Sequence, residues 1–240
     1  MKPLKVYIGW DPNEVAAYEV AVHSLLRHAS VPVSVTPLRL ERLAEAGLVF
    51  RPRFQRLDNG RLWDHLSQAY CATEFAVTRF LTPTLAQEGW TLFVDCDVVF
   101  TGDVADLFAH ADDRYAVMCV KDDYRVDLGT KMVDQVQYPY ERKNWSSVML
   151  FNCDHPSVRA LSCTKVGNMR GLDLHQFAWL RDDAIGELPP RWNWLVGAQP
   201  PRASGIAHFT LGGPWLPGWV PREFDDLWEE ARCLTTATPS

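Results

Sequence analysis

The sequence predicts a single α/β domain over residues 1–240, with a mixed, mostly parallel sheet flanked by helices. A chain of 240 residues can bury the core of one large domain. Its 47% hydrophobic and 22% charged residues are ordinary for a folded globular protein. Short apolar runs of strand length alternate with segments of helical period, the pattern of β-α-β units. We expect residues 211–240 to form a C-terminal loop and a helix packed on the same domain.

The first elements predict a β-α-β unit. Residues 4–9, LKVYIG, have the composition of a buried strand. A helix is expected to begin at Asp11, with Asp11 as N-cap, Pro12 at the first helical position and Glu14 as capping-box partner. The run VSVTPL at residues 33–38 then predicts a second strand, parallel to the first.

The rest of the chain continues the alternation less regularly. Residues 41–64 predict an irregular connection with one helical turn, and residues 67–80 predict a helix that Pro83 limits. The later elements follow in chain order: a strand from residue 91, a helical turn at 104–108, strands at 115–120 and 146–152, helices at 155–166 and 172–180, a strand at 206–210 and a final helix at 222–234. The loop 121–140 is long enough to be a lid.

Charge, cysteine usage and hydropathy exclude several classes of function. The net charge of -6 argues against a nucleic-acid surface, which needs clustered basic residues. The six cysteines form no C-x-x-C pair, and several lie in apolar runs, so we expect reduced thiols and a cytoplasmic protein. No signal-peptide hydrophobic region and no apolar run of membrane-spanning length is present.

The stretch TLFVDCDVVFTGD at residues 91–103 carries the clearest chemistry. If the strand continues to Asp97, then Asp95 and Asp97 face one side while Cys96 faces the other. Two such carboxylates repel each other unless a cation joins them. Ligands of α/β sheets bind at the carboxyl ends of strands, and paired carboxylates suit Mg²⁺ or Mn²⁺. His208 is the candidate third ligand, although a histidine in an apolar strand is by itself more often a hydrogen-bonded core residue; a nitrogen ligand favours Mn²⁺.

Residues 78–108, TRFLTPTLAQEGWTLFVDCDVVFTGDVADLF, resemble glycosyltransferase family 8, which includes glycogenin and bacterial lipopolysaccharide galactosyl- and glucosyltransferases. Weaker matches follow in the family's order: GWDPNEVAAYEVAVHSLLRHA, SSVMLFN, LDLHQFAWL and HFTLGGPW. The resemblance implies a GT-A (Rossmann-like) fold. It also implies transfer of a sugar, with retention of configuration, from a nucleotide-diphosphate sugar, most simply a UDP-sugar, to a glycan or another hydroxyl acceptor.

The resemblance also implies roles at the matching positions. The divalent cation and, through it, the donor diphosphate would be held by Asp95, Asp97 and His208. Asp11 and Asn13 match positions that hold the nucleotide base. Arg79 matches an arginine near the donor sugar, and Gln176 a glutamine placed against the reactive face of that sugar.

The chain departs from the family pattern at three places. The family's Asn-Ser-Gly is replaced at residues 145–147 by Trp-Ser-Ser, and its Asp-Gln-Asp at 175–177 by His-Gln-Phe. His175 is the polar group that remains there. The lysine of the last family motif is missing, and the backbone N–H groups of residues 211–213, including Gly212 and Gly213, are expected to bind phosphate instead.

Two alternative functions stay open. The missing lysine and carboxylates favour a non-catalytic nucleotide-sugar or glycan-binding protein. A sugar nucleotidyltransferase would need a glycine-rich basic loop after the first strand, and IGWDPNEV has one glycine and no basic residue.

Several of these residues also have simpler structural interpretations. Asp11 can be only a helix cap, Arg79 a surface residue of a helix, and Gln176 a packing residue. Four tryptophans can line an acceptor wall or only pin loops: Trp192, Trp194, Trp215 and Trp219.

Overall fold

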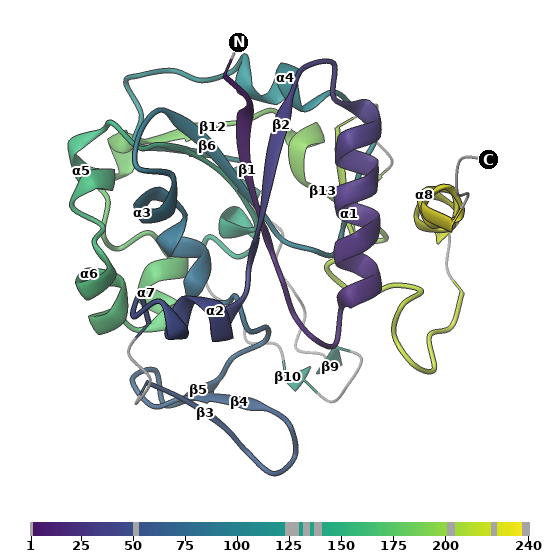
Figure 1. Ribbon diagram of the computed structural model, residues 1–240, viewed down its shortest axis with the longest axis horizontal. Helices are drawn as coiled ribbons and strands as arrows, with labels where there is room; N and C mark the ends of the chain where they lie inside the picture. Colours follow the sequence, from purple (N-terminus) through teal and green to yellow (C-terminus); the bar gives the residue numbers. More distant parts are fainter. Residues whose placement is uncertain are drawn as a thin grey trace.

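The central layer of the protein is a six-stranded sheet in the order β12-β8-β11-β6-β1-β2 (Figure 1). The computed structural model describes residues 2–49, 53–122, 130–131, 135–136, 141–200, 205–221 and 225–236. The strands of the sheet are β12 (Ile185–Glu187), β8 (Val117–Cys119), β11 (Val148–Asn152), β6 (Trp90–Val94), β1 (Leu4–Gly9) and β2 (Val33–Leu38). Strand β11 runs antiparallel to both neighbours, and the other strands share one direction. The predicted mixed, mostly parallel sheet is confirmed.

Helices cover the sheet, so its central strands are buried on both faces. In Figure 1, helices α1 (Val15–His28) and α8 (Asp225–Thr236) lie to the right of the strands, and α3 (Thr82–Ala86), α5 (Pro156–Arg159) and α6 (Cys163–Asn168) lie to the left. Every residue of β8 and β11 is buried. Burial on both faces explains why these strands read as continuous apolar runs rather than as alternating patterns.

A second sheet has three strands in the order β13 (Trp194–Leu195), β14 (Ile206–His208) and β7 (Val98–Phe100). Strand β7 follows β6 after the three residues 95–97, and β14 pairs with it antiparallel. Helix α8 packs on this sheet and on α1, with Trp228 and Ala231 in the shared apolar cluster. The final helix is therefore present where the sequence predicts it.

The first predicted helix boundary was wrong. Helix α1 begins at Val15, and its N-cap residue Glu14 makes no side-chain capping bond. The carboxylate of Asp11 instead accepts hydrogen bonds from the backbone N–H groups of Asn13 (2.9 Å) and Glu74 (2.9 Å). Asp11 therefore ties the β1–α1 turn to a distant loop, a tertiary contact that outweighs the local capping preference.

The predicted helix over residues 67–80 was also wrong. The structure has a short strand β5 (Ala69–Tyr70), an irregular stretch and a 3-10 helix η2 (Thr78–Leu81) before α3. The ring of Phe75 packs directly against Gly9, where an added Cβ would lie 2.5 Å from the ring. Burying this ring against the end of β1 fixes a bent path that a continuous helix cannot follow.

The remaining elements refine the predicted connections. Residues 41–64, predicted to be irregular, include part of helix α2 (Leu40–Glu45) and the strands β3 (Phe54–Arg56) and β4 (Leu62–Asp64), which join β5 in a small antiparallel sheet. The predicted helix at 155–166 is divided into α5 and α6, because Ser162 caps a new helix by accepting from the N–H of Lys165 (3.2 Å). The other elements are α4 (Val104–Phe108), α7 (Gly171–His175), β9 (Thr130–Lys131), β10 (Gln135–Val136), η3 (Trp145–Ser147), η4 (Asp182–Ala184) and η5 (Pro190–Asn193).

Two predictions concern residues that the structure does not describe. Most of the loop at 121–140, predicted as a lid, lies outside the described residues, as does Phe224 of the last helix. Among the helices that the structure describes, none has the length and apolarity to cross a membrane.

Candidate metal centre at the carboxyl edge of the sheet

Asp95, Cys96 and Asp97 form the bend between β6 and β7, at the carboxyl end of a buried parallel strand. One ligand atom from each of Asp95, Asp97 and His208 lies within 4.8 Å of the others. Cys96 faces away from them, and its thiol donates to a carboxylate oxygen of Glu14 at 3.2 Å. The two aspartates therefore share one side of the bend, although the strand that was predicted to carry them ends at Val94.

His208 reaches this site through the pairing of β14 with β7. His208 lies opposite Val98 in that ladder, one residue beyond Asp97. The N–H of Phe209 also donates to the carbonyl of Asp97 at 2.8 Å. Because the ladder fixes the register, the histidine is brought beside the aspartates from far along the chain.

The ring of His208 is held on both sides. Its Nδ1 lies 2.8 Å from Oδ1 of Asn193, and its Nε2 lies 3.3 Å from Oδ1 of Asp97. The Asn193 amide group donates in turn to the carbonyl of Asn144 at 3.0 Å. His208 and Asn193 are 2% and 1% exposed, so this network is inside the protein.

The negative charge of Asp95 is balanced by the positive charge of a buried arginine. Its Oδ1 lies 2.7 Å from Nη1 of Arg79, which also donates to the carbonyl of Ser146 at 2.9 Å. Burial raises the pKa of Asp95 to about 6, with the Arg79 charge opposing this shift and the Asp97 charge adding to it. The N–H of Asp95 donates to the carbonyl of Ser147 at 2.9 Å, which fixes the backbone at the end of β6.

The alternative that Arg79 lies on the surface of a helix is wrong. Arg79 is 5% exposed and belongs to η2. Its guanidinium lies 5.2 Å from the ring centre of Phe75 and 5.0 Å from that of Phe93. A cation held between two aromatic rings and a carboxylate has a fixed position.

The three candidate ligands fit a divalent cation. In an octahedral site with bonds of about 2.1 Å, neighbouring ligand atoms are about 3.0 Å apart, close to the 3.3 Å between His208 Nε2 and Asp97 Oδ1. Two carboxylates with one imidazole are a donor set that suits Mn²⁺. The side chain of Asp97 is 16% exposed, so it borders solvent while His208 is enclosed.

Helix α7 places His175 beside Ser146, whose carbonyl accepts a hydrogen bond from Arg79. The Nδ1 atom of His175 lies 2.6 Å from Oγ of Ser146, and its ring meets that of Phe80 edge-on at 5.4 Å. Burial, with the charge of Arg79 as a second cause, lowers the pKa of His175 to about 3. His175 is therefore neutral at physiological pH.

The two residues after His175 differ in burial. Gln176 is half-buried, and its carbonyl accepts from Nη1 of Arg142 at 2.9 Å. Phe177 is fully buried with φ +57° and packs near Trp179, 6.1 Å between ring centres. Phe177 is thus a core residue. Its left-handed backbone ends the predicted helix of 172–180 early.

Asp11 and Asn13 lie at the carboxyl end of β1, which is the direct neighbour of β6. Asp11 is 5% exposed, and its Oδ1 accepts from both the backbone and the side-chain nitrogen of Asn13, at 2.9 and 3.0 Å. The structure therefore places both residues along the same sheet edge as Asp95.

The turn after β14 requires its glycines. Gly212 has φ +100°, and its N–H donates to the carbonyl of Phe209 at 2.8 Å. A Cβ on Gly213 would lie 2.0 Å from the ring of Trp215. The Gly212 donor is thus engaged within the turn, and phosphate binding by this segment stays a prediction.

The tryptophans divide into two groups. Trp192 and Trp194 are buried at 1% and 5% exposed, which agrees with a packing role. Trp215 is half-buried between Phe209 and Trp228.

Sequence reasoning missed Asn193 and Asn144 as parts of the site. Asn144 has φ +66°, a conformation that asparagine tolerates better than most residues. Its position just before the Trp-Ser-Ser replacement was the available signal. Asn193 had no such signal, because it stands in an irregular segment rich in proline and tryptophan.

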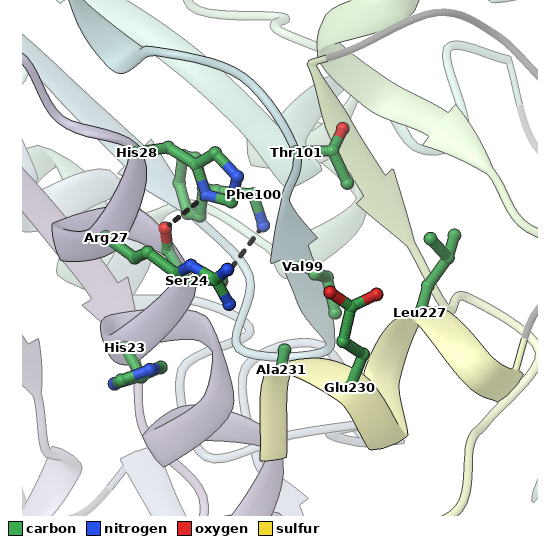
Figure 2. Close-up of a pocket in the computed structure, with 10 residues that line it drawn as sticks. All are labelled: His23, Ser24, Arg27, His28, Val99, Phe100, Thr101, Leu227, Glu230 and Ala231. Carbon is green, nitrogen blue, oxygen red and sulfur yellow. Dashed lines mark hydrogen bonds between the residues drawn. The ribbon is translucent and has the colours of Figure 1, made fainter. Parts of the chain in front are cut away.

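A separate cavity of about 120 Å³ lies between α1, β7 and α8 (Figure 2). Ser24 and His28 line it, but their hydrogen bonds are internal: Ser24 Oγ accepts from the N–H of Phe100 (3.0 Å), and His28 Nδ1 lies 2.9 Å from the carbonyl of Ser24. None of the predicted site residues lines this cavity.

Several solved structures that resemble this fold are glycosyltransferases. No family model matches the chain. The apo form of GlyE from Streptococcus pneumoniae TIGR4 has a TM-score of 0.61 at 16% identity, over 96% of this chain and 60% of GlyE. The chain thus spans less than two thirds of GlyE. LgtC, in the form of an active-site mutant, has a TM-score of 0.57 at 14% identity, over 98% of both chains. Mouse xyloside xylosyltransferase 1 has 0.53 at 13% identity, over 89% of this chain and all of that one.

These likenesses establish the GT-A fold of glycosyltransferases for this chain. In sequence, the similarity to a curated plant protein is much stronger. Protein CDI of Arabidopsis thaliana is 42% identical over 234 residues, which are 95% of this chain and 85% of that protein. The chain therefore belongs to the same family as Protein CDI of Arabidopsis thaliana.

Proposed function

We propose that this protein is a metal-dependent glycosyltransferase that transfers a sugar from a nucleotide-diphosphate sugar to a hydroxyl acceptor. The observation that carries the proposal is the Asp95, Asp97 and His208 cluster at the carboxyl edge of a GT-A sheet. LgtC, which shares the fold, was solved with donor and acceptor sugar analogs. The resemblance to glycosyltransferase family 8 extends the proposal to a UDP-sugar donor, a glycan acceptor and retention of configuration.

Asp95, Asp97 and His208 would hold the divalent cation, with Mn²⁺ favoured over Mg²⁺ by the imidazole. When bound, such a cation neutralises the charge that develops on the leaving diphosphate. Arg79 keeps Asp95 ionised and in place through its 2.7 Å contact. Asp97, at the exposed side of the cluster, borders the space that the diphosphate would occupy.

The other predicted residues would position the donor. Asp11 and Asn13 would hold the nucleotide base at the end of β1, and the turn containing Gly212 and Gly213 would lie near the phosphates. Gln176, at the end of α7, would face the reactive side of the sugar.

His175 acts in this proposal as a neutral positioning group rather than as an acid. Its pKa of about 3 leaves it unprotonated at physiological pH. Its 2.6 Å contact with Ser146 Oγ holds the end of α7 against the turn that supports Asp95. The proton of the acceptor hydroxyl would then pass to the departing phosphate on the same face of the sugar.

We also propose that the protein works in the cytoplasm, as the six free cysteines favour. A single catalytic domain over residues 1–240 and the absence of nucleic-acid partners belong to the same proposal.

A second candidate is a nucleotide-sugar-binding protein without transferase activity. It is favoured by the burial of Phe177, where the family resemblance expects a carboxylate near the sugar. Binding of the donor without turnover would distinguish this candidate from the enzyme.

The test is a calorimetric titration of UDP, GDP, CDP, ADP and CMP, each with and without Mn²⁺. Wild type would be compared with Asp97→Ala and with Asp58→Ala, an exposed control on the β3–β4 turn. The proposal expects tight Mn²⁺-dependent binding of one diphosphate, lost in Asp97→Ala and kept in Asp58→Ala. Binding of no diphosphate, or binding that ignores Mn²⁺, would overturn it. Release of free nucleotide from the matching sugar donor then separates an enzyme from a binding protein.

A further inference from the structure

A buried line of hydrogen bonds joins the candidate ligand His208 to the turn at residues 142–147. It runs from His208 Nδ1 to Asn193 Oδ1 (2.8 Å) and from Asn193 Nδ2 to the carbonyl of Asn144 (3.0 Å). Asn193 is 1% and Asn144 8% exposed. Because both asparagines are buried, the hydrogen bonds between these side chains determine which nitrogen of the His208 ring carries the proton.

The orientation of the Asn193 amide is determined by its second partner. A backbone carbonyl only accepts, so the nitrogen of the amide must face Asn144 and the oxygen must face His208. An amide oxygen also only accepts, so Nδ1 of His208 carries a proton. In the neutral ring, Nε2 is then the atom with the free lone pair.

That lone pair faces a carboxylate. Nε2 of His208 lies 3.3 Å from Oδ1 of Asp97, and in the neutral ring with its proton on Nδ1 neither of these two atoms can donate a hydrogen bond to the other. A cation bound between them joins two acceptors that otherwise oppose each other. Metal-binding histidines usually have such an outer partner on the second ring nitrogen.

We propose that Asn193 is the positioning residue of this metal centre. It holds His208 in the Nδ1–H tautomer, so that Nε2 is presented beside Asp95 and Asp97. Through Asn144 it connects the ligand to the turn whose carbonyls bind Arg79 and the backbone of Asp95. This inference rests on the metal site of the proposed function and makes the site selective for Mn²⁺ over Mg²⁺, because the nitrogen ligand is fixed.

Two substitutions separate the two bonds of Asn193. Asn193→Leu removes the acceptor and the donor, whereas Asn193→Asp keeps an acceptor for Nδ1–H and removes the donor to Asn144. Asn152→Leu is the matched control, since Asn152 is a buried asparagine (6% exposed) at the far end of β11 from the metal cluster.

The readouts are direct. Nitrogen-15 NMR at pH 8 gives the His208 tautomer in metal-free protein, assigned by the signal missing in His208→Gln. Titration with Mn²⁺ and with Mg²⁺ gives the affinities, and electron spin echo spectroscopy of the Mn²⁺ form reports a bound imidazole nitrogen. Thermal unfolding of each variant shows that it is folded.

We expect wild type to show the Nδ1–H tautomer. Asn193→Leu should weaken Mn²⁺ binding about 10- to 100-fold, with a smaller loss for Mg²⁺, and should lose the imidazole signal. Asn193→Asp should stay within a few-fold of wild type, and Asn152→Leu should bind as wild type does.

Four outcomes would overturn the inference. An Nε2–H tautomer in folded wild type contradicts it directly, without any metal. Equal losses of Mn²⁺ affinity in Asn193→Leu, Asn193→Asp and Asn152→Leu would reduce Asn193 to general packing. Wild type that binds no Mn²⁺ would remove the metal site of the proposed function and this inference with it, whereas Mn²⁺ binding unchanged in Asn193→Leu would remove the inference alone.

Discussion

At the scale of single residues, the site depends on how a few buried charges are balanced. Arg79 pairs with Asp95 inside the protein, with 6% and 12% of their side chains exposed. Arg79→Leu would leave a buried carboxylate without its counter-charge, which costs about 3–5 kcal/mol of stability in comparable cases. Urea unfolding measures this loss. Removing an exposed pair by Arg114→Leu should change the free energy of unfolding by less than about 1 kcal/mol. Equal effects of the two substitutions would contradict a buried ionic role for Arg79.

His175 makes a specific prediction for acid stability. Its pKa is lowered from 6.5 to about 3 in the folded protein, so the unfolded chain takes up a proton that the folded protein refuses. The stability from this group is complete above pH 6.5 and is lost as pH falls towards about 3, by up to about 1.4 kcal/mol per pH unit. His175→Gln, which has no titrating ring, should show a shallower decline of the free energy of unfolding over this range. If the free energy of unfolding of wild type and of His175→Gln declined in parallel over this pH range, His175 would not be held neutral in the folded protein.

Asp95 predicts how metal binding depends on pH. Burial raises its pKa to about 6, and a cation binds only the ionised carboxylate. Mn²⁺ affinity should therefore be constant well above pH 6 and fall as pH decreases through it, by up to about tenfold per unit for one proton. Calorimetry at several pH values measures this, and an affinity that stays level down to about pH 5 would count against Asp95 as a ligand.

At the scale of elements, strand pairing decides what lies beside the aspartates. Strand β14 carries His208, and helix α8 packs against it in a shared apolar cluster. Trp228 of α8 is 3% exposed, and its ring centre lies 5.7 Å from that of Trp215. Trp228→Ala should cost about 3–5 kcal/mol of stability. It should also weaken Mn²⁺ binding, because β14 loses its support.

The control for this effect is Trp63→Ala, in the small β3-β4-β5 sheet. Thermal unfolding and Mn²⁺ titration of both variants separate general destabilisation from an effect on the site. Unchanged Mn²⁺ affinity in folded Trp228→Ala would show that β14 keeps its position without α8.

The element boundaries show where local signals fail. Asp11, Pro12 and Glu14 form a good capping pattern, yet α1 begins at Val15 because Asp11 bonds to the backbone of Glu74. Phe177 has a helical sequence context, but burial of its ring in the core comes with a left-handed backbone. In the first case a contact with a distant part of the chain outweighed local propensity, and in the second case burial of an aromatic ring in the core did.

At the scale of the whole molecule, metal binding and folding should be linked. Asp95 and Asp97 lie between β6 and β7, and His208 lies on β14, which is more distant in the chain. Because the unfolded chain cannot bring them together, Mn²⁺ should raise the midpoint of thermal unfolding in a concentration-dependent way. The increase should vanish in Asp97→Ala and after chelation, as scanning calorimetry can show. A midpoint that Mn²⁺ leaves unchanged would argue against a site formed by the fold.

The sequence by itself determined the α/β class, the β-α-β opening, the main buried strands and the position of Asp95 and Asp97 at the end of β6. These features follow from local periodicity and from the chemistry of adjacent residues, which any stretch of chain displays directly. The tertiary structure decided the rest: β14 pairs with β7 and so delivers His208, Asn193 orients that histidine, and Arg79 is buried against Asp95. Such contacts depend on strand register and on which distant surfaces pack together, and no short stretch of sequence encodes either.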